Sequence, residues 1–136
     1  MAQKKAVGFV IPNQEGKFLM QLRDNKPNIP YPAHWVFPGA TVEEGEEPVE
    51  AVLREIPEEF EIGVSPGEVV FIGDYTRDDG VECFIYAYRG GKEPQKITEG
   101  QRFHYFSIEE IRRLPLGFQQ NKFLLPLAEK YAARGM

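Results

Sequence analysis

Three glutamates, Glu55, Glu58 and Glu59, are the residues whose type and spacing best suit them to chemistry. They lie in a segment with helical periodicity, where residues three and four positions apart share one side, so Glu55 faces both of the others. Like charges at this spacing destabilise an isolated helix by roughly 0.2–0.5 kcal/mol per pair, so folding alone does not favour the cluster. A hard divalent cation does, because it prefers oxygen ligands. The spacing therefore predicts a metal site, with a solvated acidic helix face as the alternative.

The residues around the glutamates form a longer pattern in fixed register. Its members are Glu46, Arg54, Glu55, Ile56, Glu58, Glu59 and Ile62. This pattern resembles the Nudix box, G-x5-E-x7-R-E-U-x-E-E-x-G-U, in which U is a bulky aliphatic residue. The preceding Trp-Val-Phe-Pro-Gly run is also typical of the family's approach to the box helix. On these residues the chain is identified as a member of the Nudix hydrolase family, similar to its MutT-like members.

The resemblance implies a role for each matched residue. The implied metal ligands, for Mg²⁺ or else Mn²⁺, are Glu55, Glu58, Glu59 and the backbone carbonyl of Gly39. Glu99, in the loop before the last expected strand, is the candidate for a further ligand or for the catalytic base acting on water. Glu46 and Arg54 would form a structural pair that holds the loop against the helix. The implied reaction is hydrolysis of a diphosphate by water attack at phosphorus.

Three positions depart from the family's pattern. Ala40 and Glu61 stand where the box has glycines, so we expect altered backbone geometry before and after the helix. Pro57 occupies a variable position but lies inside the helix, where a proline typically costs ~3 kcal/mol and introduces a kink. Such a kink would move Glu55 relative to Glu58 and Glu59, so reduced activity is one prediction.

Residues outside the box are candidates for contacts with a small, nucleotide-like phosphorylated substrate. Arg23 is placed to reach a phosphate, while Trp35, Phe37 and Tyr75 could stack on a base, and Asn121 could read a base edge. A place in the hydrophobic core is the alternative for each aromatic residue, and helix capping is the alternative for Asn121.

The resemblance to small MutT-like proteins implies a nucleoside triphosphate pyrophosphohydrolase. A nucleotide-sugar or dinucleoside polyphosphate hydrolase is the alternative within the family. A catalytically weak Nudix-fold nucleotide-binding or regulatory protein would bind nucleotide without turnover. An α/β interaction module with an acidic helix would bind no Mg²⁺. Many relatives pair, so we expect a monomer or a homodimer.

Composition narrows the remaining classes. The 136 residues suit one domain. The net charge of -5 argues against nucleic-acid binding, which needs a surplus of Lys and Arg. The apolar stretch from Ala6 to Pro12 is too short to span a membrane and lacks a signal-peptide cleavage pattern. The single cysteine, Cys83, agrees with a reducing compartment, so we expect a cytoplasmic protein without membrane association.

The candidate site residues must be held in place by helices and strands, and the pattern of apolar residues along the sequence predicts an α/β (α+β) fold. We expect a hairpin from strands 4–12 and 17–23, a proline-rich loop at 24–34, and a helix from Pro48 to about Phe60. Further elements are expected at Glu68–Tyr75, Val81–Arg89 and Arg102–Phe106 as strands, and at Phe118–Ala133 as a terminal helix. Together with the resemblance, this order implies a Nudix-like α/β/α sandwich with a mixed central β-sheet.

Overall fold

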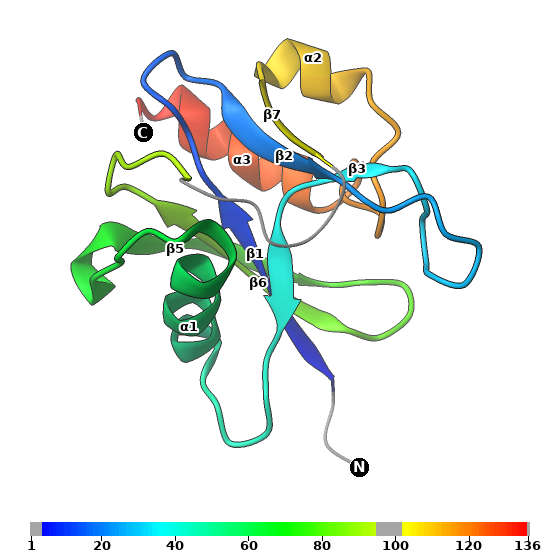
Figure 1. Ribbon diagram of the computed structural model, residues 1–136, viewed down its shortest axis with the longest axis horizontal. Helices are drawn as coiled ribbons and strands as arrows, with labels where there is room; N and C mark the ends of the chain where they lie inside the picture. The colour runs from blue at the N-terminus through cyan, green and yellow to red at the C-terminus, as the bar shows by residue number, and fades with distance from the viewer. Residues whose placement is uncertain (1–3, 95–101, 136) are drawn as a thin grey trace.

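The computed structural model describes residues 4–94 and 102–135 and places helices on both faces of a mixed β-sheet (Figure 1). Its strands are β1 (Lys5–Val10), β2 (Phe18–Leu22), β3 (Trp35–Val36), β4 (Gly39–Thr41), β5 (Val69–Thr76), β6 (Glu82–Tyr88) and β7 (Arg102–Phe106). Its helices are α1 (Pro48–Phe60), the 3-10 turn η1 (Pro66–Glu68), α2 (Ile108–Arg112) and α3 (Leu124–Ala133).

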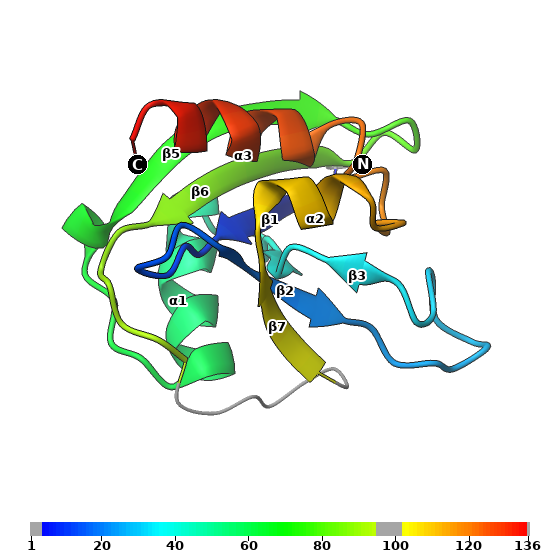
Figure 2. The same cartoon turned by 90° about the horizontal axis from the view of Figure 1, so that it is seen from above.

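Four strands form the larger sheet, in the order β4-β1-β6-β5. β1 runs parallel to β6, whereas β4 and β5 pair with their neighbours in antiparallel fashion, so the sheet is mixed as predicted. β3, β2 and β7 form a second, antiparallel sheet. Seen from above in Figure 2, the larger sheet lies between α3 and α1. The expected α/β/α sandwich is therefore confirmed.

Alternating side chains on the central strands supply two separate cores. On β1, Val7 and Phe9 pack toward α1, while Val10 packs toward α3. On β6, Ile85 faces the α3 side and Tyr88 the α1 side. We call these clusters the α1 core and the α3 core. Because successive strand residues point to opposite faces, a strand buried on both faces reads as the continuous apolar run seen near the N-terminus.

The helix α1 matches the predicted bounds because its signals are local. Pro48 occupies the first turn, where its missing N–H costs nothing, and the Glu47 backbone N–H donates to the Glu50 carboxylate at 2.8 Å. The buried face consists of Ala51, Val52, Ile56 and Phe60. The helix continues through Pro57 and ends at Phe60, the predicted end.

The expected hairpin is correct only at its turn. Asn13 accepts hydrogen bonds from the backbone N–H groups of Glu15 and Lys17, at 2.9 and 3.0 Å, and Gly16 has a φ of 76°. Beyond the bridge between Pro12 and Phe18, however, β1 and β2 join different sheets. The apolar pattern identified both strands but carried no information on their partners.

The terminal helix is shorter than predicted. It begins at Leu124, because Phe118 and Gln119 adopt φ values of 55° and 60°, which an α-helix excludes. Pro126 therefore falls in the first turn of α3, where it is tolerated. Among the described residues, no helix is both long and apolar enough to cross a membrane.

Candidate active site

The three box glutamates lie on the surface of α1. Glu58 is exposed, Glu55 and Glu59 are half-buried, and the Glu55 carboxylate contacts the Arg54 guanidinium. Within residues 4–94 and 102–135, no three acidic, histidine or cysteine side chains are already gathered to hold a metal ion. Their helical spacing brings the glutamates within reach of one another by side-chain rotation, and carboxylate oxygens are the donors that Mg²⁺ prefers. The donor chemistry therefore fits a hard divalent cation. Glu99 lies outside the described residues.

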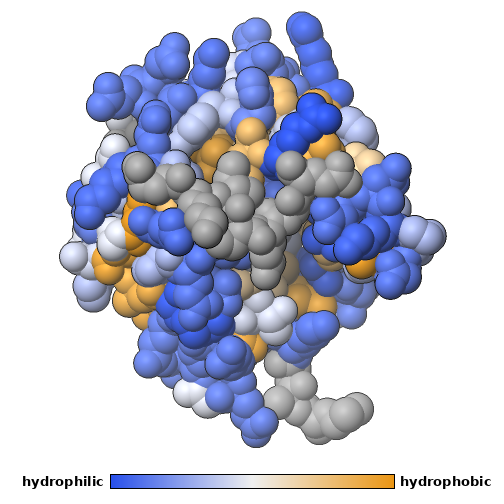
Figure 3. All heavy atoms as spheres, in the orientation of Figure 1, coloured by the Kyte–Doolittle hydropathy of each residue, from blue (hydrophilic) through white to orange (hydrophobic). Residues whose placement is uncertain are grey.

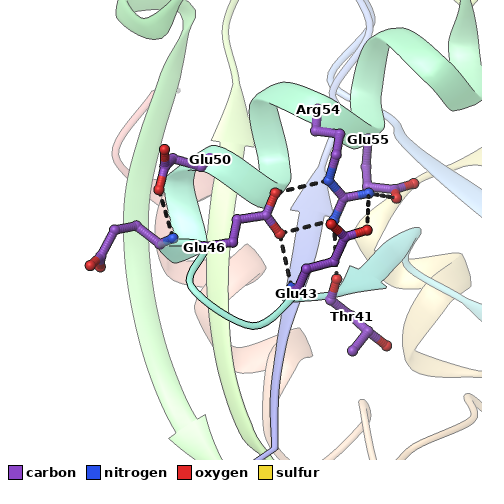
Figure 4. Close-up of polar contacts among 7 residues, drawn as sticks. Thr41, Glu43, Glu46, Glu50, Arg54 and Glu55 are labelled. Atoms are coloured by element: carbon purple, nitrogen blue, oxygen red, sulfur yellow. Dashed lines mark hydrogen bonds and ion pairs between the residues drawn. The ribbon is translucent and has the colours of Figure 1, made fainter.

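The predicted pair of Glu46 and Arg54 is confirmed as a two-point contact (Figure 4). The Arg54 Nε donates to Glu46 Oε2 at 2.8 Å and Nη2 donates to Oε1 at 3.0 Å. The hydrogen bond from Arg54, followed by one from the backbone of Glu43, lowers the Glu46 pKa to about 2. In turn, the hydrogen bond to Glu46 raises the Arg54 pKa. Both groups are thus charged at neutral pH.

This ion pair fixes the loop that leads into α1. Arg54 Nη2 also donates to the carbonyl of Thr41 at 3.3 Å, and the Glu43 backbone N–H donates to Glu46 Oε1 at 2.9 Å. Figure 3 shows hydrophilic side chains over the loop 42–47, at the foot of the view. Since the loop has little apolar surface to bury, the polar contacts to Arg54 determine its path.

The start of β4 tolerates only glycine. A Cβ built at Gly39 would lie 2.4 Å from the Val7 carbonyl oxygen, because β4 pairs closely with β1 there. Ala40 replaces the first box glycine within this strand, opposite Val7, and does not have a positive φ. The expected distortion at Ala40 is therefore absent.

The second departure from the box is accommodated differently. Glu61 itself takes the left-handed conformation that ends the helix, with φ 53° and ψ 39°. Its backbone N–H donates to the Pro57 carbonyl at 3.0 Å. The helix therefore ends where a glycine would end it, but with a residue that pays a steric penalty for this geometry.

A pocket of about 260 Å³ opens beside β4. Gly39 and Thr41 form part of its lining, so the pocket adjoins the start of the box. Of the predicted substrate contacts, it brings together Arg23, Phe37 and Tyr75. It also includes Gln120, an amide of the same segment as Asn121, and residues that the sequence did not single out, namely Lys4, Gln21, Arg77 and Phe118.

The other two predicted substrate residues lie elsewhere. Trp35 packs edge-on against Phe106, with ring centroids 4.9 Å apart. Asn121 accepts from the Leu116 backbone N–H and donates to the Leu114 carbonyl, both at 3.0 Å. Neither residue lines the pocket, so Trp35 takes the core alternative and Asn121 stabilises the turn before α3.

Phe118 organises the mouth of the pocket. The guanidinium carbons of Arg23 and Arg77 lie 4.9 and 5.1 Å from its ring centroid, within cation–π range. The Tyr31 ring contacts it at 4.9 Å. Three segments, the loop after β2, the turn after β5 and the segment before α3, therefore meet at one ring. Burial lowers the Arg23 pKa, partly offset by Asp24.

The half-buried side chain of Tyr75 forms another part of the pocket wall. Its ring stacks on Phe123 at 5.0 Å with an interplanar angle of 11°. Burial, and then the neighbouring Cys83, raise the pKa of the Tyr75 hydroxyl, so this group stays protonated at neutral pH. It is suited to hydrogen bonding and packing, and unsuited to acting as a base.

A family model supplies the deciding comparison. The model for the NUDIX domain matches residues 2–127, which is nearly the whole chain. The chain belongs to the Nudix family. With the glutamates of the box retained, it is a Nudix-type pyrophosphohydrolase.

Solved structures agree with the Nudix fold. The solution structure of the E. coli ORF135 protein is 25% identical with a TM-score of 0.74, covering 98% of this chain and 91% of that chain. A MutT protein from Methanosarcina mazei Go1 is 22% identical with a TM-score of 0.70, covering 97% and 94%. The NUDIX domain of Shewanella oneidensis NrtR, complexed with ADP ribose, is 18% identical with a TM-score of 0.75, covering 100% and 90%.

One of the pocket residues that the sequence analysis of this Nudix domain did not select, Arg77, could have been predicted from its position in the sequence. Arg77 follows Tyr75 by two positions at the end of a strand, and alternate strand residues share a face. The prediction for Tyr75 could thus have been extended to Arg77. Phe118 had no such signal, because its place depends on a positive φ and on contacts with distant segments.

Proposed function

We propose that this chain is a Mg²⁺-dependent nucleoside triphosphate pyrophosphohydrolase of MutT type, which releases pyrophosphate and a nucleoside monophosphate. The observation that carries the proposal is the pocket beside β4. It combines aromatic walls, amides and cations, and it meets the Nudix box at Gly39 and Thr41. This is the combination that a base linked to a chain of phosphates requires.

The pocket is about large enough for the base of the proposed substrate, which leaves the phosphates outside it. Its volume of about 260 Å³ is near the lower end for small-molecule sites, which begin at roughly 300 Å³. A flat ring system suits this space, and the phosphates would then lie outside it, past Gly39 and Thr41 and toward α1 (Figure 1).

The residues of α1 would act on the phosphates. Glu55, Glu58 and Glu59, with the Gly39 carbonyl, would hold Mg²⁺. When bound, the cation neutralises the diphosphate and acidifies a water molecule. A carboxylate, for which Glu99 is our candidate, would hold the attacking water and accept its proton. The water oxygen then forms a bond to phosphorus as the bridging P–O bond breaks. The pair of Glu46 and Arg54 keeps the loop and helix in register during these steps.

The test is release of pyrophosphate from a panel of nucleoside triphosphates in Mg²⁺, and separately in Mn²⁺. Glu58→Gln removes one proposed ligand charge, and Glu44→Gln is the matched control, since Glu44 is an exposed glutamate outside the box positions. We expect turnover in wild type and Glu44→Gln, and a loss of at least about 100-fold in Glu58→Gln. Equal turnover in both variants would remove Glu58 from the site.

A second candidate substrate class is favoured by one relative. The NrtR NUDIX domain was solved with ADP ribose, so the same panel includes ADP ribose, nucleotide sugars and dinucleoside polyphosphates. Turnover of these compounds, with the triphosphates untouched, would replace the proposed substrate. Nucleotide binding without any turnover would instead indicate a catalytically weak binding or regulatory protein.

A further inference from the structure

The charged side chains that line the pocket are all hydrogen-bond donors, whereas Gln21 and Thr41 each carry a donor and an acceptor. Lys4, Arg23 and Arg77 contribute only N–H groups, and no aspartate or glutamate lines the pocket within the described part of the chain. A base that presents acceptors therefore meets partners here. A base that presents an amino group at the same place faces other donors, which leaves buried polar groups unsatisfied.

The buried side-chain amide of Gln120 does not supply the acceptor that an amino group would need. Gln120 Oε1 accepts from the Phe37 backbone N–H at 2.7 Å, and its Nε2 lies 3.4 Å from the Phe37 carbonyl. Its acceptor oxygen is thus already engaged in joining the segment before α3 to the strand region that leads to β4. The Tyr75 hydroxyl is hydrogen-bonded to the Cys83 side chain, so it adds no free acceptor for an amino group.

Two contacts fix the position of the Arg77 side chain. Its Nε and Nη2 donate to the Asp79 carboxylate at 3.0 and 2.6 Å, and its guanidinium lies over the Phe118 ring. A guanidinium carries five N–H groups, so these two bonds leave three at the Nη1 and Nη2 end. A guanidinium fixed in this way can donate to two adjacent acceptors at once.

We propose that this pocket selects 6-oxopurines, guanine and hypoxanthine alike, and that Arg77 is the specificity-determining residue. The inference rests on the proposed function and names its substrate class. Guanine presents O6 and N7 as adjacent acceptors, whereas adenine has an amino group in place of O6. An 8-oxo-purine carries a hydrogen on N7, so it replaces one acceptor with a donor and is disfavoured for the same reason.

Binding of nucleoside monophosphates tests base selection separately from turnover. GMP, IMP, AMP and 8-oxo-GMP would each be titrated into the intact chain by calorimetry in the presence of Mg²⁺. We expect GMP and IMP to bind with similar Kd values, and AMP and 8-oxo-GMP to bind about tenfold more weakly or worse. AMP or 8-oxo-GMP binding as tightly as GMP would overturn the proposal. Tight GMP with weak IMP would also overturn it, because recognition would then depend on the 2-amino group.

The role of Arg77 is tested with Arg77→Lys, which keeps the charge but loses the planar two-donor geometry. Arg112→Lys is the matched control, because Arg112 also pairs with a carboxylate, Glu129, but lies on α2 away from the pocket. We expect Arg77→Lys to raise the Kd of GMP and of IMP about tenfold and to leave the Kd of AMP unchanged, so that the variant no longer discriminates 6-oxopurines from adenine. Equal weakening of all ligands would assign Arg77 to the phosphate and overturn the proposal.

The two proposals fail in distinguishable ways. Selective binding of GMP and IMP without hydrolysis of any triphosphate would contradict the proposed function and keep the base selectivity. Hydrolysis of all triphosphates at equal kcat/KM would keep the function and contradict the selectivity. Binding of none of the four monophosphates at millimolar concentration would count against the pocket as a base site.

Discussion

Arg54 has four partners around the box within the described residues. It contacts Glu46, Glu43, Glu55 and the Thr41 carbonyl, so one guanidinium joins the loop to the helix (Figure 4). The contact with Glu46 could be predicted, since both residues belong to a motif with fixed spacing. The Phe118 cluster could not, because nothing local in the sequence indicates that two arginines from the loop after β2 and the turn after β5 meet this ring.

The lowered pKa of Glu46 predicts a contribution to stability that depends on pH. Its value falls from 4.5 to about 2 on folding, so the contribution is present above about pH 4.5 and is lost as the pH falls toward about 2. Glu46→Gln should remove this contribution and flatten the decline of Tm with acidification in that range. Thermal unfolding at several pH values measures it, with Glu44→Gln as the control that should follow wild type. Parallel curves for wild type and Glu46→Gln would contradict the prediction.

Glu61 predicts a stabilising substitution. Relief of the left-handed strain is worth about 1–2 kcal/mol, and the greater backbone entropy of glycine in the unfolded chain offsets part of it. Glu61→Gly should therefore raise the free energy of unfolding by about 0.5–1 kcal/mol in urea titrations. Glu44→Gly, at an exposed position without a positive φ, should give no gain. A loss of stability in Glu61→Gly would contradict this account.

At the scale of elements, local patterns were reliable where local forces dominate. The bounds of α1 follow from its cap and its apolar spacing, both readable in the sequence. β3 and β4 were missed because they span two and three residues, too few for an alternating pattern. The start of α3 was misplaced because the turn of Phe118 and Gln119 is held by contacts with other segments, including two hydrogen bonds between Gln119 and Asp78.

Pro57 makes α1 less stable than its length suggests. It removes the backbone hydrogen bond to the Leu53 carbonyl, although the helix continues past it. Pro57→Ala should restore this bond and raise the free energy of unfolding by about 1–3 kcal/mol, measured in urea. Pro66→Ala is the control, because Pro66 begins η1, where a missing N–H costs nothing. An unchanged midpoint in Pro57→Ala would mean that the helix has adjusted fully to the proline.

At the scale of the whole molecule, the acidic loop and helix predict a response to divalent metal. A ligand that binds only the folded chain at 100 times its Kd stabilises it by about 2.7 kcal/mol. We therefore expect Mg²⁺ to raise Tm and a chelator to reverse the rise. Glu58→Gln should lose most of this shift while Glu44→Gln retains it. An equal shift in both variants would indicate nonspecific screening of the net charge of -5.

The separation of the α1 core from the α3 core affects how substitutions can accumulate in this protein during evolution. Ile56 of the α1 core and Leu124 of the α3 core belong to separate clusters, with the central sheet between them. Free energies of substitution add for sites that share no partners. Changes at pocket residues of the α3 core, such as Ile85 and Leu124, are therefore expected to add to changes in the α1 core without altering their effect on stability. A lineage could therefore change residues on the α3 side of the pocket while the packing of the helix that carries the box stayed the same.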